Sequence, residues 1–229
     1  QVSELAQNAW KDLTMSQNDY YKSFNMSYAF IKNDVEDVNE AIKQTNRLLT
    51  MESDLANTFG YDIDYAANAI TWALKGSYNY IDNLMLGITG TKMGFLEAAR
   101  NAGYMVDEIS ELSSVDMLNI LEKYMNDYGA VGKTAEEAAK TIAGSTRMMK
   151  ASWENLKLAL GTGEGLDEAF ANFQEAFTNV IGNIQPVLER IKENLPQFIE
   201  GLEQILPQIV ELLTPVLTVI VDSLGELLT

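Results

Sequence analysis

The amino-acid sequence predicts an all-α protein, and three observations lead to this class. Apolar residues recur at alternating spacings of three and four over most of the chain, which places them on one face of a helix. Capping boxes, in which a hydroxyl and a carboxylate close the first helical turn, start at Ser113 and Thr134. Strand patterns are weak, and residues 87–90 are typical of a turn. The expected architecture is a compact bundle of short helices flanked by long helices, with an elongated, Pro-kinked, coiled-coil-like helix at the C-terminus.

The composition excludes several classes of function. The 229 residues suffice for a sizeable core, or for one domain with an appendage. Asp and Glu number 33 against 16 Lys and Arg, and the net charge of −17 repels phosphate, so no direct nucleic-acid binding is expected. Cysteine and histidine are both absent, which removes thiolate nucleophiles, catalytic triads and imidazole metal sites. We therefore expect no enzyme, no catalytic residue, no cofactor and no metal site.

Residues 1–60 are predicted to form long N-terminal helices, because neither Gly nor Pro occurs before Gly60. Both ends of the chain fall within helical pattern, which suggests a piece of a longer protein. One apolar stripe in this region is predicted to face a partner and consists of Ile31, Val35, Val38, Ile42, Thr45 and Leu49.

Residues 61–160 are predicted to form the compact helical bundle. Asp62 can cap the first of its helices, and frequent glycines keep the segments before Gly132 short. The dense apolar content of this part, including Trp72, is expected to build its structural core.

The last helix of the bundle, predicted over 134–160, carries the clearest pattern and is called the signature helix below. Its capping box joins Thr134 and Glu137, and Gly161 is expected to end it. A stripe at spacings of three and four, predicted to be buried, consists of Ile142, Thr146, Met149, Trp153, Leu156 and Leu160. Of these, Met149, Trp153 and Leu156 are expected in the structural core, with a cost of ~3–5 kcal/mol for Trp153→Ala.

A Gly-rich joint over 161–165 leads to an elongated apolar helical segment, 166–229. That segment and the joint together hold eleven acidic and two basic residues. A four-four stutter is expected at Leu195, and each of the four prolines should kink the helix or start a new one. The residues predicted to mediate self-association are Leu166, Phe170, Phe173, Phe177, Val180, Ile184, Val187, Ile191, Leu195, Phe198, Leu202, Ile205 and Ile209.

The narrow stripe of this segment needs a partner, and another copy of the chain is the expected one. We expect parallel copies in register, with three as the number suggested by the mix of Ile, Val and Leu. The glycines of the joint also allow the segment to fold back on its own bundle.

Three shorter patterns have functional and structural interpretations. Residues 129–134 resemble the end of a phosphate-binding loop, but Asp127 stands where its first glycine belongs, and helix capping explains the residues. Asp62 and Asp64 resemble the start of a calcium loop, but Ala66 stands at a ligand position, so capping is favoured again. Met148, Met149 and Trp153 could form an adaptable binding face, although their spacing favours a buried core.

The apolar C-terminal run also raises the possibility of a membrane segment. Its longest uncharged stretch, 212–221, is shorter than the ~20 residues that a bilayer requires, and acidic residues flank it. The alternative function is therefore a secreted, membrane-active helical protein whose bundle releases its apolar helices into bilayers.

The most specific segment of the sequence is T-A-E-E-A-A-K-T-I-A-G-S-x-x-M-M-K-A-S-W-E-N-L at 134–156. It resembles the signature of the phage tail tape measure family. Similar segments precede it at 66–76 (A-A-N-A-I-T-W-A-L-K-G), 80–91 (Y-I-D-N-L-M-L-G-I-T-G-T) and 95–99. A proline-containing tail with L-P-Q-I-V at 206–210 follows it. The resemblance covers the chain from about residue 57 to the C-terminus.

The resemblance implies a structural function. A tape measure protein occupies the lumen of the virion tail after assembly in the host cytoplasm, sets tail length, and leaves ahead of the genome at ejection. Its implied partners are further copies of itself, tail tube and tail tip proteins, and the host membrane at ejection. A helix rises about 1.5 Å per residue, so residue number converts linearly to length, as a ruler requires. The length of the parent chain would distinguish this function from the membrane-active alternative.

Overall fold

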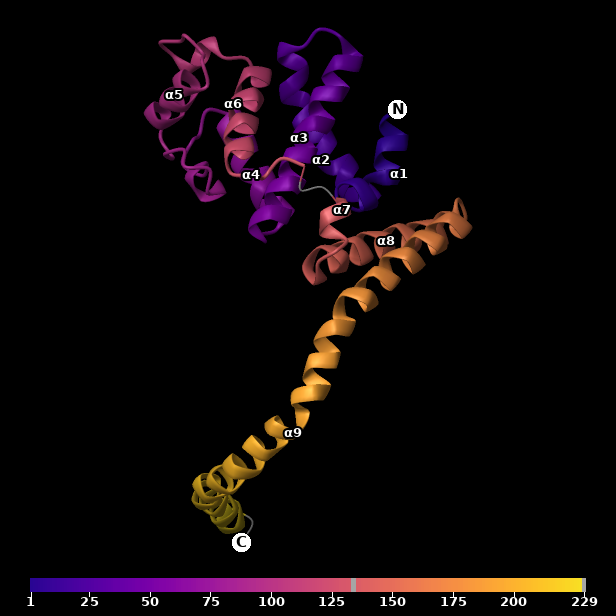
Figure 1. Cartoon of the computed structure of the whole chain (residues 1–229), viewed down its shortest axis with the longest axis vertical. Helices are drawn as coiled ribbons and strands as arrows, with labels where there is room; N and C mark the ends of the chain where they lie inside the picture. The colour runs from indigo at the N-terminus through magenta and orange to yellow at the C-terminus, as the bar shows by residue number, and fades with distance from the viewer. Residues whose placement is uncertain (133–134, 228–229) are drawn as a thin grey trace. The chain divides into compact units, whose positions relative to one another are not determined.

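The computed structural model describes the backbone of residues 1–132 and 135–227, and side-chain packing through residue 197 (except at 133–136) together with 199, 200 and 207. Every regular element in these ranges is helical and none is a strand, which confirms the all-α class (Figure 1). The helices are α1 Val2–Asp12, α2 Gln17–Asp34, α3 Val38–Phe59, α4 Ile63–Leu74, α5 Lys92–Asn101, α6 Ser114–Asp127, α7 Ala135–Ala138, α8 Ile142–Thr162 and α9 Leu166–Leu227, with 3-10 turns at Asp82–Leu84 and Ile109–Glu111.

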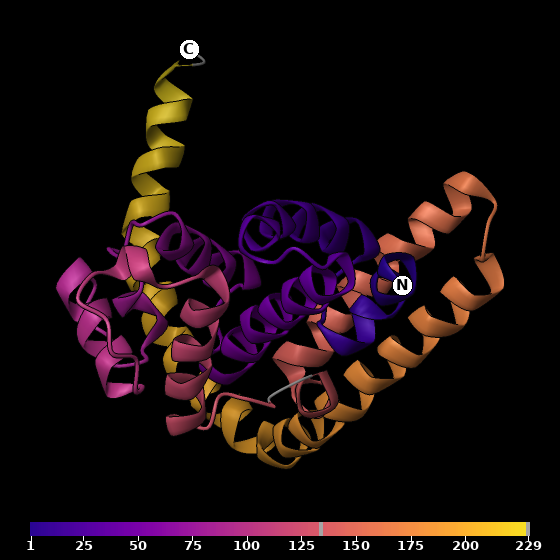
Figure 2. The ribbon, with the colours of Figure 1, turned by 90° about the horizontal axis from the view of Figure 1, so that it is seen from above.

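Two compact units divide the chain, Gln1–Asn183 and Ile184–Thr229. The larger hydrophobic core of the first unit lies among α3, α4, α5 and α6, where Phe95 is fully buried and stacks on Tyr78 with ring centroids 5.1 Å apart. A second cluster joins α1 and α2 to the other side of α3. The helix α3 therefore contributes to both clusters, and the views of Figures 1 and 2 show it in the middle of this unit.

Local signals for helix ends were predicted correctly. Gly60 ends α3 in the left-handed conformation, with φ of 77°. The Asp62 carboxylate accepts from the Asp64 amide at 3.1 Å and so caps α4, as favoured over calcium binding. Ser113 and Asp116 form the expected capping box of α6. Each of these signals needs only residues within one turn of the chain, so the sequence alone specifies it.

The predicted stripe from Ile31 to Leu49 does not lie on one helix. The chain breaks after Asp34, and Asp37 starts α3 by accepting from the Glu40 amide at 2.8 Å. Ile31 and Leu49 are buried on different helices, whereas Val38 is 52% exposed. The capping carboxylate of Asp37 therefore prevailed over the apolar spacing, which continued across the turn by coincidence.

The signature helix is also interrupted. Its first turn is α7, and α8 begins only at Ile142, so the prediction of one helix over 134–160 was wrong. The Thr141 hydroxyl accepts from the Gly144 amide at 3.0 Å and caps α8. The helix then continues past Gly161 to Thr162, and Gly163, with φ of 76°, ends it. Thr134, the first residue of the predicted capping box, lies outside the described residues.

The four prolines of α9 do not end its helix, because the helical backbone runs from Leu166 to Leu227 through all of them. Pro186, Pro196 and Pro207 are exposed. Each removes one intrahelical hydrogen bond, and the carbonyl it leaves unpaired can be hydrated on the exposed side. Of the two outcomes expected at each proline, the start of a new helix is therefore excluded, and a kink stays a prediction.

Candidate functional site

The region that resembles the tape measure family most specifically centres on α8, which holds α7, the N-terminal helices and α9 together. The end of α7 and the start of α8 approach each other most closely at Gly144, where a Cβ atom would lie 2.2 Å from the carbonyl oxygen of Ala138. Next to it, the fully buried Ser145 donates to the Thr141 carbonyl at 2.7 Å. Small side chains at these positions let α7 fold back against the start of α8.

Asn183, on α9, supplies hydrogen bonds to the backbone at the break between α7 and α8. Its amide nitrogen donates toward the Ala139 carbonyl at 2.6 Å and the Thr141 carbonyl at 3.1 Å, and lies 2.9 Å from the Ser145 hydroxyl. Carbonyls released by a helix break need partners when they are partly buried. Asn183 supplies one from a different helix, which ties α9 to the break.

The first part of α9 lies antiparallel beside α8 (Figures 1 and 2). Near the joint, Ala169 and the half-buried Phe173 pack with Leu156 and Ala159 of α8. Further along, the fully buried Ala176 packs in a cluster whose other buried members are Trp10, Met148 and Ala151. We call the residues of α9 that make these contacts, together with the buried Val180, the inner seam: Ala169, Phe173, Ala176, Val180 and Asn183.

The helix α8 buries mostly small residues, together with Met148 and Leu156, and exposes several of its large ones. Its buried positions include Ser145, Ala151, Ser152 and Ala159, which permit close contact with α1, α2, α7 and α9. The predicted stripe lies mostly on the other side, where Ile142 is 43%, Trp153 44% and Leu160 60% exposed. The prediction that this stripe is buried was therefore wrong, except at Leu156.

Of the residues predicted in the structural core, only Leu156 is fully confirmed as buried. Met149 is half-buried. Trp153 contacts Phe173 with ring centroids 5.3 Å apart but keeps much of its surface exposed. Trp72 is 45% exposed and contacts Tyr80 and the Lys75 ammonium, because the core side of α4 is filled by Ala66, Ala69, Ile70 and Ala73.

Polar side chains of α8 reach the N-terminal helices. The Asn155 side-chain oxygen accepts from the Gln17 amide at 2.8 Å, at the first turn of α2. Arg147 donates to the Asn57 side-chain oxygen of α3. Burial lowers the pKa of the Arg147 guanidinium, and the nearby Asp62 carboxylate opposes this shift. The partners in these two contacts are 138 and 90 residues apart in the sequence, so no local pattern predicts the contacts.

The residues predicted for self-association fall into three groups. Phe173 and Ile184 are half-buried and Val180 is buried, so Phe173 and Val180 belong to the inner seam within one chain. The side chains of Phe198, Leu202, Ile205 and Ile209 lie outside the described residues. The exposed members are Leu166, Phe170, Phe177, Val187, Ile191 and Leu195.

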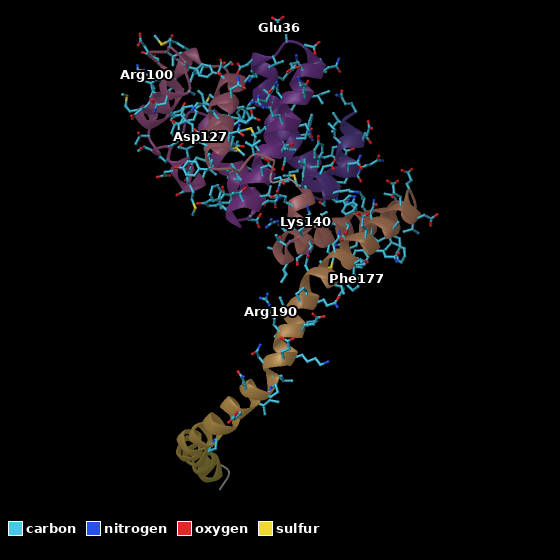
Figure 3. All side chains as sticks on the ribbon, viewed as in Figure 1. Glu36, Arg100, Asp127, Lys140, Phe177 and Arg190 are labelled. Carbon is cyan, nitrogen blue, oxygen red and sulfur yellow. The ribbon has the colours of Figure 1, made fainter. Side chains whose placement is uncertain are left out.

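Two further exposed residues change the pattern. Ile181 and Leu188 are 52% and 58% exposed and were not predicted, because the expected stripe used Val180 and Val187. With them, an unbroken four-three spacing starts at Phe177 (labelled in Figure 3) and needs no stutter. We call it the outer seam, and its positions in the sequence are Phe177, Ile181, Ile184, Leu188, Ile191, Leu195, Phe198, Leu202, Ile205, Ile209, Leu212 and Val216.

Glu52 is a titratable side chain that is buried without a hydrogen-bond partner among the described residues. Glu52 of α3 is 1% exposed, and among the described residues neither of its carboxylate oxygens has a hydrogen-bond partner. Burial, and secondarily the negative charge of Asp64, raise the pKa of Glu52 to about 8. Glu52 is therefore mostly protonated at pH 7 and cannot act as an anionic ligand in this form.

Metal ligands and membrane spans were also considered. Within the described residues, no group of three or more acidic side chains is placed to hold a metal ion. None of the helices in the part of the chain that the structure describes combines the length and apolar content that crossing a bilayer requires. A cavity of about 610 Å³ lies among α1, α3, α8 and α9, and the Lys11–Glu175 ion pair is part of its lining.

The chain matches no family model, no curated protein and no solved structure at a significant level. The geometry of the two seams is therefore the main basis for a functional proposal.

Proposed function

We propose that this chain is part of a structural ruler of a phage tail, a tape measure protein that sets tail length and leaves with the genome. It associates with copies of itself through an elongated, coiled-coil-like C-terminal segment, and tail tube and tip proteins surround it. Support comes from the sequence resemblance at 134–156 and from the all-helical fold.

The observation that carries the proposal is the outer seam. Among its described positions, Phe177, Ile181, Leu188, Ile191 and Leu195 are between 42% and 58% exposed in the single chain. A regular apolar row of this kind on a long helix is the surface that coiled-coil formation buries. Another copy of the chain offers an identical row, so it is the partner with matching spacing.

The residue types of the outer seam indicate how many copies associate. When Ile181 is assigned to the first core position of the heptad, Leu188, Leu195 and Leu202 share that position with Ile209 and Val216. The second core position then holds Ile184, Ile191 and Ile205, together with Phe177, Phe198 and Leu212. Leucine at the first and isoleucine at the second favour three or four parallel helices over two. We propose three or four parallel copies in register.

The prolines are compatible with this packing. Pro186 and Pro207 are 21 residues, or three heptads, apart and occupy the position farthest from the outer seam. Pro196 and Pro215 also lie off the seam. An interior proline costs a helix ~3 kcal/mol, so a helix with four of them needs the additional stability that burial of its seam supplies.

Light scattering over a concentration series tests the association. We expect the full chain to form trimers or tetramers, and a chain truncated after Asn183, which keeps only the first two positions of the outer seam, to associate much more weakly. The truncation follows Asn183 and not Gly165 because the inner seam belongs to the first unit. If the truncated chain associates as strongly as the full chain, the outer seam does not drive association.

Point variants separate the seam from the rest of the segment. We expect Leu188→Glu to raise the dissociation constant by at least about 100-fold, because it places a charge in a buried apolar layer. The matched control is Gln197→Glu, which adds the same charge at an exposed position off the seam. Equal effects of the two variants would show that net charge, and not the seam, controls association.

Tail length in assembled particles tests the ruler. Deleting residues 188–208 removes three heptads and keeps the phase of the outer seam, so tails should shorten by roughly 30 Å, at about 1.5 Å per residue. Duplicating the same segment should lengthen them by the same amount. Electron micrographs measure both changes, and unchanged length in viable particles with either variant would contradict the proposal.

A further inference from the structure

The exposed apolar face of α8 is the feature that the packing of the first unit leaves unexplained. Ile142, Trp153 and Leu160 lie on one stripe of the helix and are 43%, 44% and 60% exposed. Within the chain, Trp153 packs on Phe173 but keeps much of its surface exposed, since the core side of α8 is already filled by other residues, among them Met148 and Leu156. This stripe therefore has the composition of an interaction surface.

The stripe is connected to the outer seam by a row of aromatic rings. Trp153 of α8 lies 5.3 Å from Phe173, and Phe173 lies 6.2 Å from Phe177, both measured between ring centroids. Phe177 is the first position of the outer seam, and Ile181 is the second. The exposed apolar surface thus runs from α8 onto α9 within the first unit.

This continuity identifies the occupant. Any copy of the chain that packs along the outer seam from Phe177 meets the aromatic row at the same level of α9. We propose that a second copy of this chain covers the α8 stripe, with Trp153 at the centre of the contact, so that the interface between copies begins in the first unit and not in the tail. The inference rests on the self-association proposed above and specifies where it starts.

Charge is consistent with an apolar contact between identical surfaces. The side chains that carry the row and the stripe are uncharged, in a chain with a net charge of −17. Glu154 and Lys157, which follow Trp153 in the sequence, pair with each other at 2.7 Å. Because the Glu154 carboxylate is paired within each chain, two copies can approach here without bringing two unpaired Glu154 carboxylates together.

The chain contains a matched control for Trp153. Trp72 on α4 is 45% exposed, almost the same fraction, but lies apart from the α8 stripe and contacts Tyr80 and Lys75. The third tryptophan, Trp10, is buried at 3%. A probe that reports the solvent exposure of each indole separately can therefore distinguish the proposed contact from general association.

Fluorine NMR of the full chain labelled with 5-fluorotryptophan provides that probe. Trp72→Phe and Trp153→Phe assign the three resonances. On association, we expect the Trp153 resonance to shift and to lose most of its H₂O/D₂O isotope shift, while the Trp72 and Trp10 resonances keep theirs. Light scattering on the same samples reports the oligomeric state.

The outcomes separate this inference from the proposed function. If the chain associates and the Trp153 resonance keeps its isotope shift, the α8 contact is wrong and the tail association stands. If the chain does not associate at any concentration, both are wrong.

Variants test the energetic role of the stripe. We expect Leu160→Glu to raise the dissociation constant of the full chain at least tenfold, since a charge would enter the interface, and Trp72→Ser to change it by less than about twofold. Ile142→Glu should act like Leu160→Glu; it sits in the first turn of α8, where a carboxylate is favourable for the helix, so the fold is kept. If neither glutamate variant changes the dissociation constant, no second copy covers this face.

Discussion

Glu52 shows how a single buried group sets the pH dependence of stability. Its pKa is raised from the ordinary value of 4.5 to about 8 in the folded chain. Between these two values the folded state holds a proton that the unfolded state has lost. The contribution of Glu52 is therefore most favourable below pH 4.5 and is lost progressively as the pH rises to 8.

We expect Glu52→Gln to remove this dependence. The difference in unfolding free energy between the variant and the native chain should grow with pH from about 4.5 to 8, by up to ~1.4 kcal/mol per pH unit, and then level off. Urea denaturation at a series of pH values measures it, and comparison with the variant cancels the effects of other carboxylates. A constant difference over this range would mean that Glu52 is ionised in the folded chain.

Trp153 is the second residue with a measurable consequence. Because the ring is only half covered and packs mainly on Phe173, we expect Trp153→Ala to cost the monomer ~1–2 kcal/mol. Met148→Ala, at a buried neighbouring position on α8, should cost ~2–5 kcal/mol. Denaturant melts of the chain truncated after Asn183 compare the two. A larger loss for Trp153 than for Met148 would contradict the observed packing.

At the scale of elements, the sequence predicted the helix ends at Gly60, Asp62 and Ser113 but missed the break before α8, and it predicted the buried face of α8 poorly. Ser113 and Asp116 or Asp62 act within one turn, so their residue types suffice. The face of α8 was assigned to the core because its large apolar residues recur regularly. That regularity shows that a face is to be covered, but it does not say whether the same chain covers it.

The small-residue face of α8 and its distant polar contacts are the other features that the sequence did not predict. Ser145, Ala151 and Ala159 give no apolar signal, although close packing against other helices needs residues of their size. Asn183 and Asn155 bond groups that are 38 or more residues away in the sequence. Their roles depend on the assembled fold, so no local pattern could reveal them.

Gly144 tests the packing between α7 and α8. Replacing it with alanine would bring the new methyl group against backbone atoms of Ala138, so we expect Gly144→Ala to destabilise the chain by ~1–3 kcal/mol. The matched control is Gly182→Ala on α9, where the added atom meets nothing within 4 Å. This control should stabilise by ~0.5–1 kcal/mol, since alanine favours a helix interior. Thermal melts that rank the two variants in the opposite order would contradict the fold at α7.

At the scale of the whole chain, the first unit requires part of the tail helix. A fragment ending at Asn183 keeps Ala169, Ala176 and Val180 in the core and should melt close to the full chain. A fragment ending at Gly165 exposes Trp10, Met148 and Leu156 and should melt lower, by ~2–4 °C for each kcal/mol lost. Calorimetry of the two fragments checks this, and identical melting temperatures would show that the inner seam adds no stability.

Asn183 has a mechanical consequence when the chain is placed under tension. It stands at the end of the inner seam from which the remaining tail departs, and α9 runs antiparallel to α8 up to the joint at Gly163 and Gly165. Tension on the C-terminus therefore loads the hydrogen bonds of Asn183 first and peels the seam one layer at a time toward Leu166, whereas a parallel arrangement would load all layers together in shear. Peeling requires less force than shear, and each layer released adds contour length, so we expect the chain to lengthen stepwise under load before its larger core around Phe95 unfolds.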